Sequence, residues 1–248
     1  MPLFLLHGFG NEAHIWDRFA PLVGDRYHVF ALDSRGHGDS EHAPEYGDEH
    51  NVADFTAILA ALGIQRLALV GFSMGGGTAM LFTRRNPERI ERLVIVDRGP
   101  ETDPRGRERM ARAIGKARTS FPNRDEALAY IRLANPKRPE ELVQKSLNHA
   151  FRPMQDGSYR LKQDEKLRTG FGHHGSGEDL WAIAAAIECP TLIVRGGDSD
   201  ILAQDVAERM AQVMPNAELV VVPNASHPVM MDNPPGFNRV TSEFLLRP

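Results

Sequence analysis

The chain has 248 residues, a formal net charge of -4 and a single cysteine, Cys189. This length suits one α/β domain with room for an insertion, and one cysteine excludes an intrachain disulfide. The mild acidity argues against a nucleic-acid partner, which usually requires a basic face. No apolar stretch approaches the roughly 20 residues that cross a bilayer, so no membrane partner is expected either. We expect a cytoplasmic protein.

Short apolar runs alternate with helical patterns along the chain. The runs are near-continuous rather than alternating, which is typical of parallel strands covered on both faces. They occupy residues 3–6, 29–32, 67–70, 93–96, 192–194 and 219–222. Helical patterns near 52–62, 74–85 and 203–214 lie between several of them. This rhythm predicts an α/β fold with a mostly parallel central sheet flanked by helices.

One long segment interrupts this rhythm. Residues 98–180 hold no strong strand pattern, and helical patterns occur near 106–117, 124–133 and 139–150. Residues 171–178 are rich in Gly and His and predict a loop. We therefore assign residues 1–97 and 181–248 to the α/β core. Residues 98–180 form a helical insertion in this interpretation.

The strongest motif is Gly71-Phe72-Ser73-Met74-Gly75, which follows an apolar run and begins a helical pattern. In this context a serine sits on a sharp strand-to-helix turn with its hydroxyl exposed. A side chain two residues before or after the serine would crowd the turn, so glycine suits both positions. A phosphate-binding loop is the rival interpretation, but the spacing of its glycines and its lysine are both missing. The motif predicts Ser73 as a catalytic nucleophile.

A serine hydroxyl is a weak nucleophile and needs an adjacent base. His227 follows the strand-like run at 218–223 in a short loop. Loops at the carboxyl ends of parallel strands are where α/β sheets place their sites. We therefore predict His227 as the base of Ser73.

The imidazole in turn needs a buried carboxylate that holds its tautomer. Asp198 and Asp200 lie just past one strand run, and Asp97 ends the run before it. We choose Asp200 as this acid, with Asp198 and Asp97 as the alternatives.

Acyl transfer also needs backbone N–H groups aimed at the oxyanion. Met74, the residue after the nucleophile, is one candidate donor. The segment His7-Gly8-Phe9-Gly10 follows an early strand run and supplies the second, the N–H of Phe9. His7 itself is expected to stabilise this loop rather than to act in catalysis.

Together these motifs resemble the α/β-hydrolase superfamily over nearly the whole chain, in a serine-nucleophile, carboxylesterase-like branch. The segments that carry the resemblance are 5–10, 33–40, 71–75, 195–202 and 226–238. The resemblance implies a nucleophile at Ser73 and an oxyanion donor at Phe9, and its subgroup with a Ser-Asp pair places the acid at Asp200. It also implies that the insertion is a cap that covers the site and shapes substrate choice.

The resemblance departs from the family pattern at the start of the chain. Family members usually carry roughly twenty more residues, forming a hairpin before the strand that ends at His7-Gly8. We expect either a sheet that has lost an edge or a chain shortened at its start. Because an uncovered edge invites pairing with another chain, we hypothesise a homodimer.

The function expected from this pattern is hydrolysis of a small-molecule carboxylic ester through an acyl-enzyme on Ser73. No metal-ligand spacing is evident, so neither a metal nor an organic cofactor is expected. The superfamily also includes lactonases, thioesterases, carbon–carbon bond hydrolases, perhydrolases and cofactor-free lyases. A ligand receptor that retains the triad is a further alternative, because fold alone does not choose among these functions.

Overall fold

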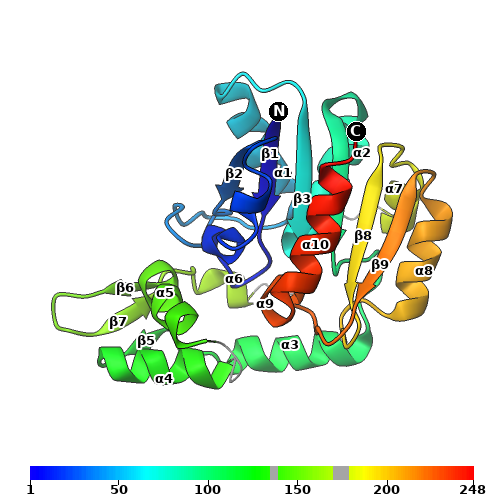
Figure 1. Ribbon diagram of the computed structural model, residues 1–248. Helices are drawn as coiled ribbons and strands as arrows, with labels where there is room; N and C mark the ends of the chain where they lie inside the picture. Colours follow the sequence, from blue (N-terminus) through cyan, green and yellow to red (C-terminus); the bar gives the residue numbers. More distant parts are fainter. Residues whose placement is uncertain (135–138, 170–178) are drawn as a thin grey trace.

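A computed structural model describes residues 1–134, 139–169 and 179–248 of the chain (Figure 1). The predicted loop at 171–178 lies outside these residues. Among the helices described, none combines the length and apolar character that a bilayer span requires.

Six parallel strands form the central sheet in the order β2-β1-β3-β4-β8-β9. Their bounds are β1 Pro2–Leu6, β2 His28–Leu32, β3 Leu67–Phe72, β4 Ile90–Val96, β8 Thr191–Gly196 and β9 Ala217–Val222. All six coincide with the predicted apolar runs. The strand that begins the chain is not an edge of the sheet, because β2 pairs with its outer side. The two edges are β2 and β9.

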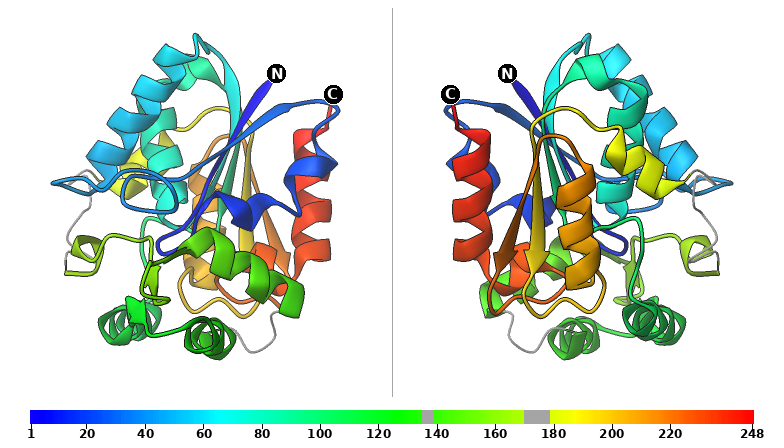
Figure 2. Two further views of the ribbon diagram at one scale, coloured as in Figure 1. Left: turned by 90° about the vertical axis from the view of Figure 1, so that its left-hand side faces the viewer. Right: turned by 90° about the vertical axis from the view of Figure 1, so that its right-hand side faces the viewer.

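Helices cover both faces of the sheet (Figures 1 and 2). One face packs on α1 (Asp48–Ala61), α2 (Met74–Arg85), α7 (Leu180–Ala185) and α8 (Gln204–Val213). The other packs on the 3-10 turns η1 (Ala13–Trp16) and η2 (Ala20–Leu22) and on α9 (Val229–Asp232) and α10 (Pro234–Leu245). Alternate residues of β1 enter opposite cores: Leu3 and Leu5 face η1 and α10, while Phe4 and Leu6 face α1 and α2. Covering on both faces explains why the strand runs are continuously apolar.

The segment between β4 and α7 lies across the carboxyl ends of the strands (Figure 1). Its helices are α3 (Pro104–Lys116), α4 (Arg124–Ala134), α5 (Glu140–Ala150) and α6 (Lys166–Thr169). A three-stranded antiparallel sheet accompanies them, formed by β5 (Ser120–Phe121), β7 (Tyr159–Leu161) and β6 (Phe151–Pro153). The sequence analysis predicted helices alone here, since strands of two or three residues are too short to show a period. A small apolar cluster around Phe121, Leu128 and Leu147 forms the core of this layer.

Candidate active site

Ser73 lies at the junction of β3 and α2, as the motif predicted. Its backbone adopts φ 51° and ψ -111°, a left-handed conformation that is strained for a residue with a side chain. The Ser73 N–H donates to the carbonyl of Val96 at 3.0 Å, and the Ser73 carbonyl accepts from the N–H of Gly77 at 3.1 Å. The surrounding backbone thus holds the turn in its strained form.

The two flanking glycines are sterically required. A Cβ on Gly71 would lie 2.3 Å from the carbonyl oxygen of Gly75, and one on Gly75 would lie 2.4 Å from the carbonyl oxygen of Leu6. Both distances are far below van der Waals contact. The crowding that the sequence analysis expected at these two positions is therefore present.

His227 lies in the loop between β9 and α9, with its ring over the turn that carries Ser73. Its Nε2 is 2.9 Å from Oγ of Ser73, and its Nδ1 is 2.7 Å from Oδ2 of Asp97. A carboxylate only accepts hydrogen bonds, so Nδ1 carries the proton and Nε2 presents its lone pair to the serine hydroxyl. The three side chains form a continuous hydrogen-bonded line.

Asp97 follows the last residue of β4 and has no exposed surface. Its φ of 46° is again left-handed. Besides His227, the carboxylate accepts from the N–H of Gly196 at 3.0 Å and from Oγ of Ser199 at 2.5 Å. Buried charge is tolerated only when it is paired or hydrogen-bonded, and these donors meet that condition.

The structure places Asp200, the residue chosen as the acid from the sequence, elsewhere. Its carboxylate forms a two-point contact with the guanidinium of Arg109 on α3, and this pairing lowers the pKa of Asp200. Asp198 lines a pocket together with Ser73 and His227, but the ring nitrogens of His227 bond to Asp97 and Ser73 instead. The choice failed because Asp97 and Asp200 follow strands that are neighbours in the sheet, β4 and β8. Their carboxyl ends open on the same space, and order along the chain does not reveal which side chain turns inward.

The buried Arg195 shapes the loop that carries Ser199 and Asp200. Its guanidinium donates to the carbonyls of Gly196 at 2.8 Å, Ser199 at 3.2 Å and Leu202 at 2.8 Å. The loop therefore curls around one cation, and this curl brings the Ser199 hydroxyl to Asp97. The sequence analysis missed both Arg195 and Ser199, because their roles depend on this folded loop.

The two predicted oxyanion donors belong to two different segments near Ser73. Met74 is the first residue of α2, and the N–H groups of a first helical turn have no acceptor within their helix. Phe9 lies in the loop after β1 and lines the pocket with Ser73 and His227. The N–H of Gly75 donates to the carbonyl of His7 at 3.1 Å, which ties this loop to the nucleophile turn.

Two buried neutral histidines support the Phe9 loop. His7 accepts from the N–H of Ser34 at 3.0 Å through Nε2 and therefore donates from Nδ1 to the carbonyl of Gly8 at 2.8 Å. His37 accepts from the N–H of Gly10 at 3.2 Å. Burial, together with the neighbouring His7, lowers the pKa of His37 to about 3, and burial lowers the pKa of His7 as well. His7 thus occupies the loop-supporting place expected of it.

Comparison with known proteins agrees with this geometry. A family model described as the alpha/beta hydrolase fold matches residues 1–234. The chain belongs to this family. It is 29% identical to an sn-1-specific diacylglycerol lipase of Mus musculus, over 98% of this chain and 80% of that protein. It is also 29% identical to an esterase of Mycobacterium tuberculosis, over 94% of this chain and 78% of that protein.

A comparison with solved structures also finds an alpha/beta hydrolase. The crystal structure of an alpha/beta hydrolase from Novosphingobium aromaticivorans superposes with a TM-score of 0.83 at 27% identity. The match covers 98% of this chain and 88% of that one. Relatives and solved neighbours of this hydrolase are thus esterases, lipases and other hydrolases of one fold.

A cavity of about 800 Å³ opens over the Ser73 hydroxyl of the hydrolase. Its wall has a polar side, with Asp198, Asp200 and Arg109. Ala113 and Ile114, which lie on α3 together with Arg109, add apolar surface to the lining. Substrate in this cavity would therefore contact both the core and the insertion.

A second cavity of about 490 Å³ continues from the first beneath α4 and α5. Phe9, Asn11, Ala113, Ile114 and Met231 line both cavities, so the two meet at these side chains. The deeper part is largely apolar, and Tyr130, Ile131, Leu142 and Phe151 contribute to it. Ile131 and Phe151 also belong to the apolar cluster of the insertion, so this cluster forms part of the cavity wall.

Proposed function

We propose that this protein is a carboxylic ester hydrolase that acts through an acyl-enzyme on Ser73. The observation that carries the proposal is the continuous hydrogen-bonded line from Ser73 through His227 to the buried Asp97. This is the arrangement that activates a serine hydroxyl in acyl transfer. The family supplies independent support, because its named members here include an esterase and a lipase.

In the proposed mechanism Oγ of Ser73 attacks the ester carbonyl while Nε2 of His227 takes the hydroxyl proton. The amides of Met74 and Phe9 stabilise the oxyanion, and one such donor is typically worth about 2.7–4 kcal/mol in the transition state. His227 returns the proton to the leaving alcohol, and then activates water that hydrolyses the acyl-enzyme. Asp97 holds the ring and stabilises the imidazolium throughout.

The cavities support a substrate with an extended apolar group. The first cavity contains Ser73 and His227 and would hold the ester carbonyl of the substrate. The second cavity continues from it into an apolar space bounded by the insertion. An acyl or alcohol chain that passes Ile114 and Met231 would bury apolar surface at about 25 cal/mol per Å². In this proposal the insertion acts as the cap that sets the size of the substrate.

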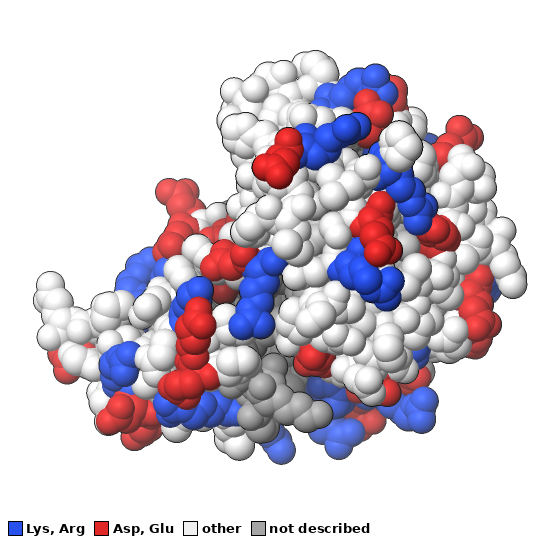
Figure 3. All heavy atoms as spheres, viewed as in Figure 1, with Lys and Arg blue, Asp and Glu red and all other residues white. Residues whose placement is uncertain are grey.

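The space-filling view supports a small-molecule substrate rather than a polyanion. Basic and acidic side chains are interspersed over the part of this face that the structure describes (Figure 3). A nucleic-acid surface instead gathers its basic residues on one face.

The test is hydrolysis of p-nitrophenyl esters of increasing acyl length by the wild type and by Ser73→Ala. We expect turnover by the wild type and a loss of at least about 10³ in kcat in the variant. A fluorophosphonate probe should add its mass to the peptide containing Ser73 in the wild type alone. Undiminished turnover by Ser73→Ala would overturn the assignment. Labelling of Ser73 without ester turnover would instead direct the search to lactones, thioesters and carbon–carbon bonds.

A further inference from the structure

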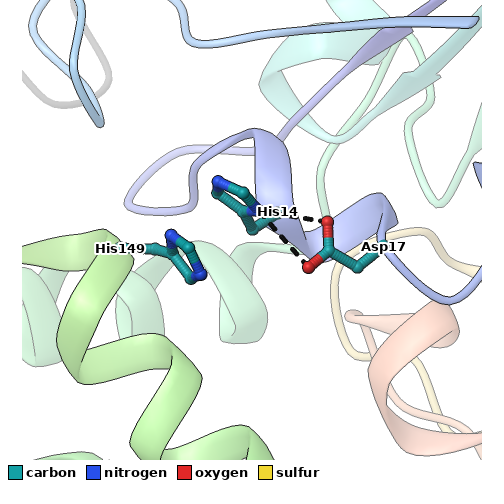
Figure 4. Close-up of side chains that lie close together, drawn as sticks. All are labelled: His14, Asp17 and His149. Atoms are coloured by element: carbon teal, nitrogen blue, oxygen red, sulfur yellow. Dashed lines mark hydrogen bonds and ion pairs between the residues drawn. The ribbon is translucent and has the colours of Figure 1, made fainter.

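A cluster of metal-ligating side chains lies away from Ser73, where the core meets the insertion. His14 belongs to η1, and Asp17 is the residue directly after the end of η1. His149 lies in the last turn of α5. Figure 4 shows the three side chains directed toward one another from these two segments. One ligand atom from each lies within 4.8 Å of the others. No spacing in the sequence pointed to this group, because His149 meets the other two only through the fold.

The donor set suits a divalent transition metal. Two imidazoles and one carboxylate are ligands of Zn²⁺, Cu²⁺ or Ni²⁺, whereas Mg²⁺ and Ca²⁺ prefer oxygen alone. Nδ1 of His14 lies 3.1 Å from Oδ1 of Asp17. Two ligand atoms at bond lengths of about 2.0–2.1 Å on a tetrahedral zinc ion are separated by roughly 3.4 Å, so this pair needs little adjustment.

The two imidazoles must move slightly to share one ion. Their rings are stacked, with centroids 3.5 Å apart and planes 23° apart, whereas a metal lies in the plane of each ring that binds it. One ring must therefore rotate out of the stack. The side chains of His14 and Asp17 are 47% and 45% exposed, so solvent rather than packed protein occupies the space required.

The charges around the cluster leave it open to a cation. Two lysines near this region are each paired with a carboxylate: Lys145 with Glu141 at 3.1 Å, and Lys162 with Asp39 at 2.7 Å. Arg18, which follows Asp17, is a further cation in the lining of this cavity. Asp17 supplies the negative charge within the cluster itself. Three protein ligands also leave a fourth position for water, as in other zinc sites with three side chains.

We propose that His14, Asp17 and His149 bind one divalent transition-metal ion, with Zn²⁺ the best match, and that this ion joins η1 of the core to α5 of the insertion. The same three residues line the outer part of the apolar cavity. A metal bound here would therefore fasten the insertion against the core beside the space assigned to substrate. The site is separate from the proposed catalytic residues and does not depend on their function.

The test is calorimetric titration of the full-length, metal-free protein with ZnCl₂, and of its variants His14→Ala, Asp17→Asn and His149→Ala. We expect one site in the wild type and an affinity at least about tenfold lower in each variant. Titration with Co²⁺ should produce visible absorption typical of a four- or five-coordinate ion with nitrogen ligands, and the signal should disappear in His149→Ala.

Two further variants separate this site from other histidines. His50→Ala is the matched control, because His50 is a partly exposed histidine beside a single carboxylate, Glu45, at 3.4 Å; zinc binding should be unchanged. His227→Ala should also retain the site. Binding that survives the loss of His149 but disappears with His227 would overturn the proposal, as would a wild type that binds no zinc.

Discussion

The carboxylate of Asp97 lies 2.7 Å from Nδ1 of His227 and has no exposed surface. A buried carboxylate in this position orients the ring and favours the tautomer whose Nε2 accepts the serine proton. Because Gly196 and Ser199 also donate to Asp97, its geometry is held from the side of β8 as well. Catalysis should therefore depend far more on Asp97 than on either aspartate of the following loop.

Asp97→Asn should lower kcat for p-nitrophenyl butyrate by about 10³–10⁴, because the amide favours the wrong tautomer of His227. Asp200→Asn is the matched control and should change kcat less than tenfold, since Asp200 pairs with Arg109. Steady-state kinetics would measure both, with circular dichroism to verify folding. An equal loss in the two variants would contradict the assignment of Asp97 as the acid.

Gly75→Ala should destabilise the fold and abolish activity. The new Cβ would lie 2.4 Å from the carbonyl oxygen of Leu6, and overpacking of this kind typically costs about 1–3 kcal/mol. Gly115→Ala is the control, because a Cβ at that helical position meets no atom within 4 Å; it should be neutral or stabilising by up to about 1 kcal/mol. Urea unfolding would measure both, and equal midpoints would disprove the steric argument.

Arg109→Ala should make the site discriminate against anionic esters. Loss of the guanidinium leaves the Asp200 carboxylate without its ion-pair partner on a cavity wall that also carries Asp198. A unit charge at about 4 Å contributes roughly 1 kcal/mol in water, so kcat/KM for p-nitrophenyl hemiglutarate should fall about fivefold relative to the neutral butyrate.

The control for Arg109 is Arg105→Ala, since Arg105 pairs with Asp103 at 3.1 Å instead. The ratio of the two kcat/KM values should stay constant in that variant. High salt should reduce the effect of Arg109→Ala, because exposed charges are screened. A salt-independent change would point to altered packing of α3 rather than to charge.

His37 should make the folded protein sensitive to acid. Burial lowers the pKa of His37 to about 3, whereas an unfolded histidine titrates near 6.5. Between these values the unfolded state binds a proton that the folded state does not. The free energy of unfolding therefore decreases as pH falls through this window, by up to about 1.4 kcal/mol per pH unit for this one group.

His37→Gln keeps a hydrogen-bond acceptor for Gly10 but removes this titration. Urea unfolding at pH 4 to 7 should give a shallower loss of stability in the variant than in the wild type. His50→Gln, at a partly exposed histidine, should leave the wild-type slope unchanged. Parallel curves for His37→Gln and the wild type would show that His37 does not carry this linkage.

Ala113→Trp should shorten the substrate that the enzyme accepts. Ala113 lines both cavities where they meet, so an indole there would separate them. We expect kcat/KM for a decanoate ester to fall at least about tenfold, the equivalent of 1.4 kcal/mol, with little change for the acetate. Ala111→Trp, on the same helix but outside both sets of lining residues, is the control. Equal effects on short and long esters would contradict the proposed chain path.

Much of the architecture followed from local sequence. The four inner strands β1, β3, β4 and β8 are largely apolar runs because both faces of the sheet are covered there, and each run is visible without knowledge of its neighbours. The position of Ser73 at a strand-to-helix turn was predictable because the constraint on that turn is local: Gly71 and Gly75 make room for it within five residues. The sequence also predicted that His227 lies in a loop after one strand, and the structure has its ring beside Ser73.

Only the tertiary structure decided which carboxylate faces His227, and it also formed the small sheet of the insertion and the cluster of His14, Asp17 and His149. Parallel strands bring several loops to one edge, so the sequence identified Asp97, Asp198 and Asp200 as candidates without ranking them correctly. The direction of each side chain there depends on contacts between distant segments, such as Ser199 with Asp97. Spacing along a chain records local geometry, whereas these contacts exist only once the strands have paired.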